Sequence, residues 1–382
     1  MSGRIRKGVV TGLVFAVILA FVLRAFVGDF YTVRSGSMLP TVRLDETVLV
    51  RFGGAIPDRF ELVVFRDADD AAVVKRAVGL PGESVRLDAG DLLVDGQKPD
   101  RSIARGPWVT LFGGAGRDAR DFFEIPQGPD GRWSVAASVL SVDASESSVE
   151  SATWRGDVDD GWLELDGSRH PGTRSVRDVL IELSIVRRSS ARPDAAFSVV
   201  LAEGCDLFEI VHTGDRLRLH RRHAVDGSVE VLDERPWPLA DGEALELALA
   251  NVDDQVIVHA GGQPLMHVRY TANRAWPESL PGDRHTRAPR VALGVDGCAV
   301  DFAIERVARD LHWISSGEFA VDDALQLGLD ELFVLGDNSP ESADGRFWGP
   351  IDRDQLVGRP LAVIRPWSAA RWLDTPSTDG QR

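Results

Sequence analysis

Short stretches in which apolar and polar residues alternate make up most of the chain beyond residue 28. The first of them read TVLVRF, ELVVFR, AVVKRAVGL, ESVRL and DLLVDG, and Gly, Pro and Asp residues stand between them. Alternation with a period of two is typical of a strand with one buried face, and turn residues between such runs favour antiparallel pairing. The pattern therefore predicts a mainly β protein built from antiparallel strands.

One long apolar run, residues 8–27, departs from this alternation and reads GVVTGLVFAVILAFVLRAFV. A helix of about 20 such residues is about 30 Å long, which is enough to cross the hydrocarbon core of a bilayer. Arg4, Arg6 and Lys7 precede the run and Asp29 follows it, so the positive-inside rule places the N-terminus in the cytoplasm. We therefore predict a single N-terminal transmembrane helix, with the rest of the chain outside the cytoplasm.

A cleaved signal peptide is the alternative interpretation, because a charged start followed by an apolar core describes both kinds of segment. Cleavage requires small residues at the first and the third positions before the cut. The pairs available after the apolar run are poor: Leu23 with Ala25, Arg24 with Phe26, and Ala25 with Val27. An uncleaved anchor is therefore favoured.

The middle of the chain differs from its flanks in the density of its strand patterns. From about residue 99 to about residue 310, runs such as VLIELSIVRR, AFSVVLAEG and RLRLHRR follow one another without long helical patterns. That density of strands predicts a β-sandwich of its own. We expect a cytoplasmic N-terminus (1–7), the anchor (8–27), the first part of one domain (28–98), an inserted β-rich domain (99–315), the second part of the first domain (316–368) and a C-terminal tail (369–382).

Charge and cysteine content exclude some functions. The 382 residues carry a net charge of -16, whereas a protein that binds nucleic acid needs a basic face to replace counterions at phosphates. Cys205 and Cys298 lie in the part expected outside the cytoplasm, where either a disulfide or two buried thiols could persist. No group of His and Cys has the spacing of a metal site. We expect no nucleic-acid partner and no metal or other cofactor.

Two residues near the predicted anchor could carry chemistry. Ser37, in SGSMLPT, would need a base to take its proton. All the histidines lie in the middle of the chain, so Lys75, in AVVKRAV, is the other candidate. A lysine between apolar neighbours loses hydration, which lowers its pKa towards the range where the neutral amine accepts a proton. The structural alternative is that Ser37 belongs to an ordinary turn and that Lys75 faces solvent.

Four sequence blocks in a fixed order decide between these interpretations. They are SGSMLPT (35–41), LDETVLV (44–50), VVKRAVGLPGESV (73–85) and GDNSPESADGR (336–346). Behind an N-terminal apolar run, this combination resembles the type I signal peptidases, or leader peptidases. These are membrane-anchored Ser-Lys proteases of the S26 type that remove signal peptides from exported proteins. The resemblance covers the apolar run and roughly residues 30–99 and 319–367, about a third of the chain.

The resemblance implies a role for each matching residue. Ser37 would be the nucleophile and Lys75 the general base. The Ser35 hydroxyl and the Ser37 backbone N–H would form the oxyanion hole, where donors stabilise the negative charge that develops in the transition state. Ser342 would orient the Lys75 amine, and an ion pair of Asp344 with Arg346 would fix the loop of Ser342. Asp337 and Asn338 would hold the start of that loop. Met38 would pack near the dyad, and Pro40 would set the turn.

The chain departs from the family pattern in two places. Gly345 stands where the family usually has Ser, and we expect looser packing of the loop there without loss of activity. The inserted segment of roughly 200 residues is larger than the β insertion that family members often carry. Its strands are weakly similar to laminin-G or concanavalin-like sandwiches, many of which bind glycans, and its ligand is not predicted.

Together these features predict a signal peptidase I at the plasma membrane, a serine endopeptidase that acts through an acyl-enzyme. Its partners would be signal-peptide-bearing preproteins and the lipid bilayer, and substrate would bind as an added extended strand. The alternative is a membrane-anchored extracytoplasmic protein that binds a glycan or a protein on a peptidase-like frame. Intact Ser37 and Lys75 favour the enzyme. A self-cleaving Ser-Lys repressor would need DNA-binding helices where this chain has its apolar run.

Overall fold

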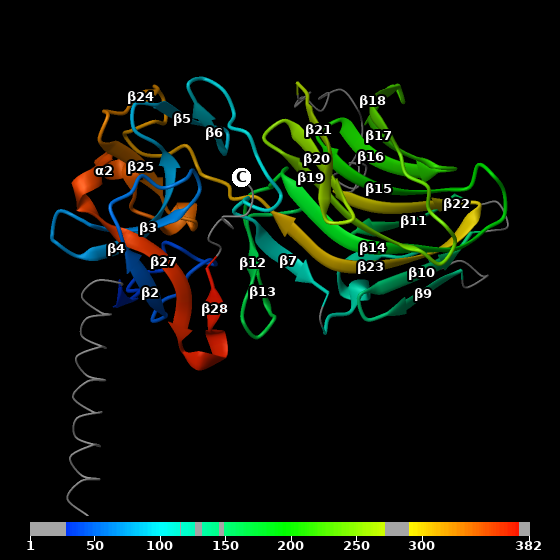
Figure 1. Cartoon of the computed structure of the whole chain (residues 1–382), viewed down its shortest axis with the longest axis horizontal. Coiled ribbons are helices and arrows are strands. Elements are labelled where there is room, and N and C mark those ends of the chain that lie inside the picture. Colours follow the sequence, from blue (N-terminus) through cyan, green and yellow to red (C-terminus); the bar gives the residue numbers. More distant parts are fainter. Residues whose placement is uncertain (1–27, 115, 127–131, 145–148, 272–289, 374–382) are drawn as a thin grey trace, which may run out of the picture. The chain divides into compact units, whose positions relative to one another are not determined.

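The computed structural model describes residues 28–114, 116–126, 132–144, 149–271 and 290–373. The chain divides into two compact units, of which the first combines Met1–Pro99 with His312–Arg382 and the second is Asp100–Leu311. In Figure 1 the first unit is drawn in blue and in orange to red, and the second mostly in green and yellow. The second unit therefore interrupts the sequence of the first.

The second unit is shorter than the expected insertion of residues 99–315, chiefly at its C-terminal end. Trp313 belongs to the first unit, because its indole ring stacks on Phe60 with 6.3 Å between ring centroids. Its Nε1 atom also donates a hydrogen bond of 3.1 Å to the carbonyl oxygen of Gly336. The assignment of these units as a catalytic domain and an inserted domain stays a prediction.

The first unit is built on an eight-stranded sheet in the order β1-β2-β27-β3-β4-β25-β26, with β28 paired to β27. All of these pairs are antiparallel. The strands are β1 (Gly28–Thr32), β2 (Thr47–Phe52), β3 (Leu62–Arg66), β4 (Ala72–Gly79), β25 (Glu331–Leu335), β26 (Ile351–Asp352), β27 (Leu356–Arg365) and β28 (Arg371–Trp372). Strands from before and after the second unit alternate in this sheet, which brings sequence blocks from both parts together.

Smaller elements complete the first unit. A three-stranded sheet has the order β24-β5-β6, with β24 at Leu325–Gln326, β5 at Ser84–Asp88 and β6 at Asp91–Val94. The helical turns are η3 (Ser339–Glu341), α2 (Gly345–Trp348), η4 (Arg353–Gln355) and η5 (Trp367–Ala369). One face of the large sheet packs into an apolar cluster formed by Val33, Met38, Val42, Val48, Val50, Leu62, Val64, Val74, Val363 and Leu373.

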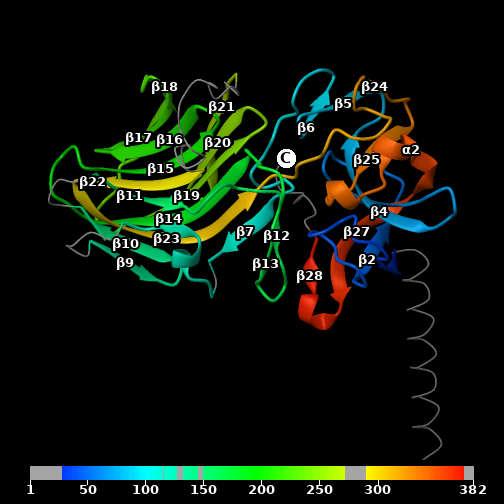
Figure 2. The ribbon, with the colours of Figure 1, turned by 180° about the vertical axis from the view of Figure 1, so that it is seen from behind.

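The second unit contains two large antiparallel sheets. The eight-stranded sheet has the order β21-β20-β19-β14-β23-β10-β9, with β7 paired to β23. Its strands are β7 (Val109–Gly113), β9 (Trp133–Ala136), β10 (Val139–Asp143), β14 (Val179–Ser190), β19 (Ala244–Val252), β20 (Gln255–Ala260), β21 (Gln263–Arg269) and β23 (Cys298–Arg309). The long strands β14 and β23 run side by side through the middle of this sheet, as Figures 1 and 2 show from opposite sides.

The other large sheet has seven strands in the order β18-β17-β16-β15-β22-β11-β8. They are β8 (Phe123–Glu124), β11 (Val149–Trp154), β15 (Ala196–Glu203), β16 (Asp206–Thr213), β17 (Arg216–His223), β18 (Val229–Pro236) and β22 (Val291–Asp296). A two-stranded sheet pairs β12 (Trp162–Leu163) with β13 (Arg169–His170), and the turn η1 covers Ala119–Asp121. Inward residues of both large sheets, such as Leu183 and Val199, share one apolar core, so the unit is a β-sandwich.

A buried ion-pair cluster ties the two ends of the second unit together. Arg101, next to its first residue, pairs with Asp310, next to its last residue, at 2.5 Å. The same guanidinium pairs with Asp253 at 2.8 Å. The Arg101 side chain is only 1% exposed, and the charges of Asp310, Asp253 and Asp178 compensate its own.

These observations confirm the prediction of a mainly β protein with antiparallel sheets. The predicted anchor, residues 8–27, lies outside the described residues. Among the residues that are described, no helix has the length and apolar character needed to span a bilayer. Cys205 and Cys298 are both buried and are not joined to each other.

Candidate active site

Ser37 lies in a closed turn that we call the nucleophile turn, residues 33–46. Two backbone hydrogen bonds close its base: Val33 N donates to Glu46 O at 2.8 Å, and Asp45 N donates to Val33 O at 2.9 Å. The turn follows β1 and leads into β2, so it is fixed at both ends by paired strands. Ser37 is only 6% exposed within it.

Lys75 lies in the middle of β4, between β3 and β25, with its side chain buried. Its Nζ atom donates to Ser37 Oγ at 2.6 Å and to Ser342 Oγ at 3.0 Å. The solvent-facing alternative for this lysine is therefore wrong, because its side chain is buried and its amine contacts Ser37 and Ser342. Burial lowers the pKa of Lys75 from 10.5 to about 8, since an apolar environment disfavours the charged amine.

Ser35 lies at the exposed side of the same turn. Its Oγ atom is 3.1 Å from Ser37 Oγ, and either hydroxyl could be the donor. The Ser35 hydroxyl is therefore within reach of the atom that would attack a substrate. The oxyanion-hole role of Ser35 and of the Ser37 N–H stays a prediction.

Asp337 and Asn338 connect the nucleophile turn to the end of β25. Asn338 N donates to Ser37 O at 3.0 Å, and its Nδ2 atom donates to Gly36 O at 3.1 Å. Asp337 accepts two hydrogen bonds from Arg76, at 2.8 and 2.5 Å, and a short one from the Thr41 hydroxyl. These contacts hold the backbone on both sides of Ser37 against the strand that carries Lys75.

Asp344 and Arg346 form a fully buried ion pair next to Ser342. Arg346 Nε and Nη2 lie 2.8 and 2.9 Å from the two Asp344 oxygens, and both side chains are 0% exposed. Arg346 also donates to the Ser339 hydroxyl and carbonyl and to the carbonyl of Ser342. Asp344 accepts the backbone N–H of Gly336 at 2.9 Å. The pair therefore fixes the loop that presents Ser342 to Lys75.

Gly336 is needed for the close approach of this loop to the nucleophile turn. A Cβ atom at this position would lie 2.1 Å from Ser342 Oγ and 2.6 Å from the backbone oxygen of Ser37. Any side chain would separate the two segments. Steric crowding therefore explains why the GDNSPESADGR block begins with glycine.

The loop is packed tightly at Gly345, so the expectation of looser packing there is wrong. The residue is buried, and a Cβ atom there would lie 2.8 Å from Phe333 Cε2 and 2.9 Å from the carbonyl oxygen of Val334. The loop is packed tightly against β25 at this point because no side chain intervenes. Glycine therefore allows closer packing here, where looser packing was expected.

Met38 is buried and Pro40 is half-buried within the nucleophile turn. Met38 is 1% exposed and belongs to the apolar cluster under the large sheet, directly after Ser37 in sequence. The Leu39–Pro40 peptide bond is cis. The specific positioning roles of both residues stay predictions.

Sequence reasoning did not single out several residues that support this arrangement. Arg76 lay inside a quoted block next to Lys75, and Thr41 lay in the block of Ser37, so a signal was present for both. Trp313 had no such signal, although its indole supports the carbonyl of Gly336. Its contact joins residues distant in the chain, which no local pattern reveals.

Comparison with known proteins identifies the family of this chain. The model of the family "Signal peptidase, peptidase S26" matches residues 6–110 and 280–367, about half of the chain. The probable signal peptidase I-2 of Synechocystis sp. is 33% identical over 111 residues, which cover 26% of this chain and 51% of that protein. Signal peptidase I S of Bacillus subtilis is 38% identical over 92 residues, which cover 23% and 49%. The chain thus spans about half the length of the curated relatives it matches.

A solved structure, the carbohydrate binding module CBM66 from Bacillus subtilis, covers 52% of this chain and 98% of its own, with 9% identity. Its TM-score of 0.33 is too low to support any conclusion about function. The family match is of a different kind, because it covers half of the chain and includes the blocks that contain Ser37, Lys75 and Ser342. The chain belongs to the signal peptidase family, peptidase S26.

Proposed function

We propose that this protein is a signal peptidase I that removes signal peptides from exported preproteins with a Ser37–Lys75 dyad. The observation that supports this most is the 2.6 Å contact between Lys75 Nζ and Ser37 Oγ, in a setting that lowers the lysine pKa to about 8. A neutral amine at hydrogen-bonding distance from a hydroxyl can take its proton, which is what a serine nucleophile requires. The intact pair also argues against the alternative of a binding protein on an inactive frame.

The proposed reaction has two halves. In the first, neutral Lys75 takes the Ser37 proton, and Oγ attacks the carbonyl carbon of the scissile peptide. The oxyanion accepts hydrogen bonds from the Ser37 N–H and the Ser35 hydroxyl, which lowers the barrier. The C–N bond then breaks, the new amine leaves with the proton carried by Lys75, and an ester joins the signal peptide to Ser37.

The second half releases the signal peptide. A water molecule gives a proton to neutral Lys75 and attacks the ester carbonyl, and the C–O bond to Ser37 breaks. Ser37 Oγ then recovers the proton from Lys75, which returns the dyad to its starting state. Ser342, which accepts a hydrogen bond from the same amine, keeps Nζ directed at Ser37 throughout.

The family resemblance completes the proposal with a substrate and a location. The substrate would lie as an extended strand beside the site, with small side chains at the first and third positions before the cut. The apolar run at residues 8–27 would anchor the protein in the plasma membrane with the catalytic unit outside the cytoplasm. We assign no cofactor to the reaction and no ligand to the second unit.

The deciding experiment uses the full-length protein in detergent or vesicles and a precursor that carries a signal peptide. We expect Ser37→Ala and Lys75→Ala each to lower the cleavage rate by roughly 1000-fold or more, because each removes one half of the dyad. Ser368→Ala and Arg365→Met change exposed residues that the proposal gives no role, and as controls they should leave the rate unchanged. Near wild-type cleavage by either dyad variant would overturn the assignment.

Ser342→Ala separates an orienting role from a chemical one. Loss of one hydrogen bond to the amine should slow kcat by roughly 10- to 100-fold without abolishing cleavage. A complete loss of activity with an intact fold would mean that Ser342 takes part in proton transfer itself.

A further inference from the structure

We propose that Arg371, on the C-terminal strand β28, is a positioning residue that holds the nucleophile turn in its productive geometry. The inference rests on the proposed function, since it concerns how Ser37 is presented to Lys75. Arg371 lies outside every block that the sequence resemblance covers. Its guanidinium donates to Ala369 O at 2.9 Å, and its hydrogen bonds to Glu46 and Thr41 are directed at the turn that contains Ser37.

The Arg371 guanidinium grips the nucleophile turn at two points. Nη1 and Nη2 lie 2.7 and 2.8 Å from the two carboxylate oxygens of Glu46, which is a bidentate pair. Nη2 also donates to the carbonyl oxygen of Thr41 at 2.7 Å. Paired hydrogen bonds from a planar guanidinium fix direction as well as distance, so this contact constrains the orientation of the turn.

Glu46 is the residue at which the nucleophile turn closes. Its backbone oxygen accepts Val33 N, and its carboxylate accepts Arg43 N at 2.9 Å. Its side chain is only 3% exposed, whereas that of Arg371 is 30% exposed. A carboxylate so buried needs its cationic partner. Without Arg371, the C-terminal end of the nucleophile turn would rearrange so that the Glu46 carboxylate reaches water.

Thr41 connects Arg371 to residues next to the dyad through its hydrogen bonds. Its carbonyl is held by Arg371, and its hydroxyl donates to Asp337. Asp337 in turn pairs with Arg76, the residue that follows Lys75 on β4. The turn is therefore fastened on one side to the strand of the base and on the other to the C-terminal strand.

Strand β28 is itself firmly placed. It pairs with β27 through Ala362 opposite Trp372 and Val363 opposite Arg371. The next residue, Leu373, is 4% exposed and belongs to the same apolar cluster as Met38. The Arg371 side chain thus starts from a strand that is paired to β27 and followed by a buried residue, as a positioning contact requires.

Loss of this contact should change catalysis in two ways that simple destabilisation would not. A displaced turn lengthens the distance from Ser37 Oγ to Lys75 Nζ, so kcat should fall by roughly 10- to 100-fold with KM little changed. A loosened turn also admits water to Lys75, whose amine faces Asp344, Asp337 and Arg346. Burial lowers the pKa of this lysine, so hydration should raise it again. The rise of kcat/KM with pH, which we call the acid limb of the pH profile, should then move to higher pH.

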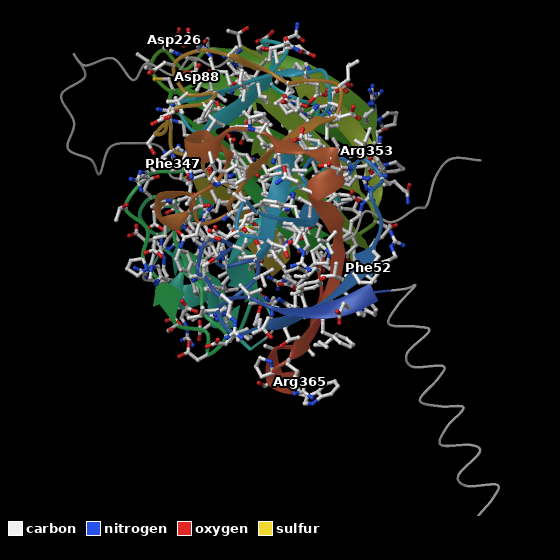
Figure 3. The ribbon with its side chains drawn as sticks, turned by 90° about the vertical axis from the view of Figure 1, so that its left-hand side faces the viewer. Phe52, Asp88, Asp226, Phe347, Arg353 and Arg365 are labelled. Atoms are coloured by element: carbon white, nitrogen blue, oxygen red, sulfur yellow. The ribbon has the colours of Figure 1, made fainter. Side chains whose placement is uncertain are left out.

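The test compares Arg371→Met with Arg365→Met in the full-length protein, assayed on a signal-peptide precursor below the melting temperature of each variant. Arg365 is exposed at the end of β27 (Figure 3) and provides an Arg-to-Met change in the same region of the chain. We expect Arg371→Met alone to lower kcat and to shift the acid limb upward. Glu46→Gln, which removes the other half of the pair, should do the same, and the double variant should add little to either single change.

Arg371→Lys covers the case in which Arg371→Met does not fold. It keeps the positive charge but loses the bidentate contact, so it should show a smaller fall in kcat in the same direction. The inference is overturned if the folded Arg371 variants match Arg365→Met in kcat and in the acid limb while only their melting temperature falls. Failure of the proposed function would look different, because wild type would then cleave nothing or Ser37→Ala would cleave normally.

Discussion

The Nζ atom of Lys75 lies 2.6 Å from the Oγ atom of Ser37, and both side chains are almost completely buried. Burial is the main cause of the lowered lysine pKa, Asp344 and Asp337 oppose it, and Arg346 adds to it. The amine is therefore mostly protonated at neutral pH and loses its proton near pH 8. The protonation state of one atom should govern both the activity and the stability of the first unit.

The first prediction concerns activity. Since only neutral Lys75 can accept the Ser37 proton, kcat/KM should rise about tenfold per pH unit on the acid side and level off above the lysine pKa of about 8. A steady-state profile from about pH 6 to about pH 10 on a precursor peptide measures this. A profile that is flat through this range would show that Lys75 is not the base.

The second prediction concerns stability. Lys75 has a pKa of about 8 when folded and 10.5 ordinarily, so between these values the unfolded chain binds more protons and stability rises with pH. Below pH 8 the buried charge destabilises the fold by about 3 kcal/mol, and above pH 10.5 this penalty is absent. Lys75→Met should therefore be inactive yet gain stability relative to wild type at pH 7, and lose that advantage near pH 10.5. Urea unfolding at both pH values checks this, and a pH-independent difference would contradict it.

The third prediction concerns the tight contact at Gly345. Gly345→Ser restores the usual family residue, but its Cβ would lie 2.8 Å from the ring of Phe333. The buried ring and the backbone must shift, so the variant should lose about 1–3 kcal/mol of stability. Gly54→Ser, where a Cβ meets nothing within 4 Å, is the matched control and should melt like wild type. Equal melting temperatures for the two variants would mean that the loop adapts freely.

The fourth prediction concerns the ion-pair cluster at the ends of the second unit. Arg101→Met leaves Asp253 and Asp310 buried without their cation, which should cost about 3–5 kcal/mol and lower the melting temperature of this unit by roughly 10 °C. Arg269→Met removes an ion pair to Asp100 whose side chains are 51% and 81% exposed, so its effect should stay below about 1 kcal/mol. Calorimetry of the full-length variants compares the two. Equal effects would show that the buried cluster does not hold the ends of the unit.

The mainly β architecture could be predicted from alternation alone, because inward apolar and outward polar residues leave a local signature in each strand. Contacts within or next to the family blocks were also within reach. The structure brings Ser37, Lys75 and Ser342 together, and each of them lay in a block that the resemblance singled out.

What escaped prediction depends on contacts between distant segments. The pair of Arg371 with Glu46 joins residues 325 positions apart and follows from the register of β28 on β27, which local patterns do not specify. The packing at Gly345 depends on Phe333, which lies in another strand. Trp313 packs on Phe60 across the interrupted sequence, a contact that no local pattern specifies.

The long separation between Lys75 and Ser342 has a consequence for a newly made chain. Ser342 follows Lys75 by 267 residues, and β27, which fills the place between β2 and β3, comes later still. At about 5–20 residues per second, a ribosome needs tens of seconds to make that stretch. Throughout this time the nascent polypeptide contains Ser37 and Lys75 but lacks Ser342 and β27. Under the proposed function, peptide hydrolysis can therefore begin only after Ser342 and β27 have been synthesised and have folded onto the earlier strands.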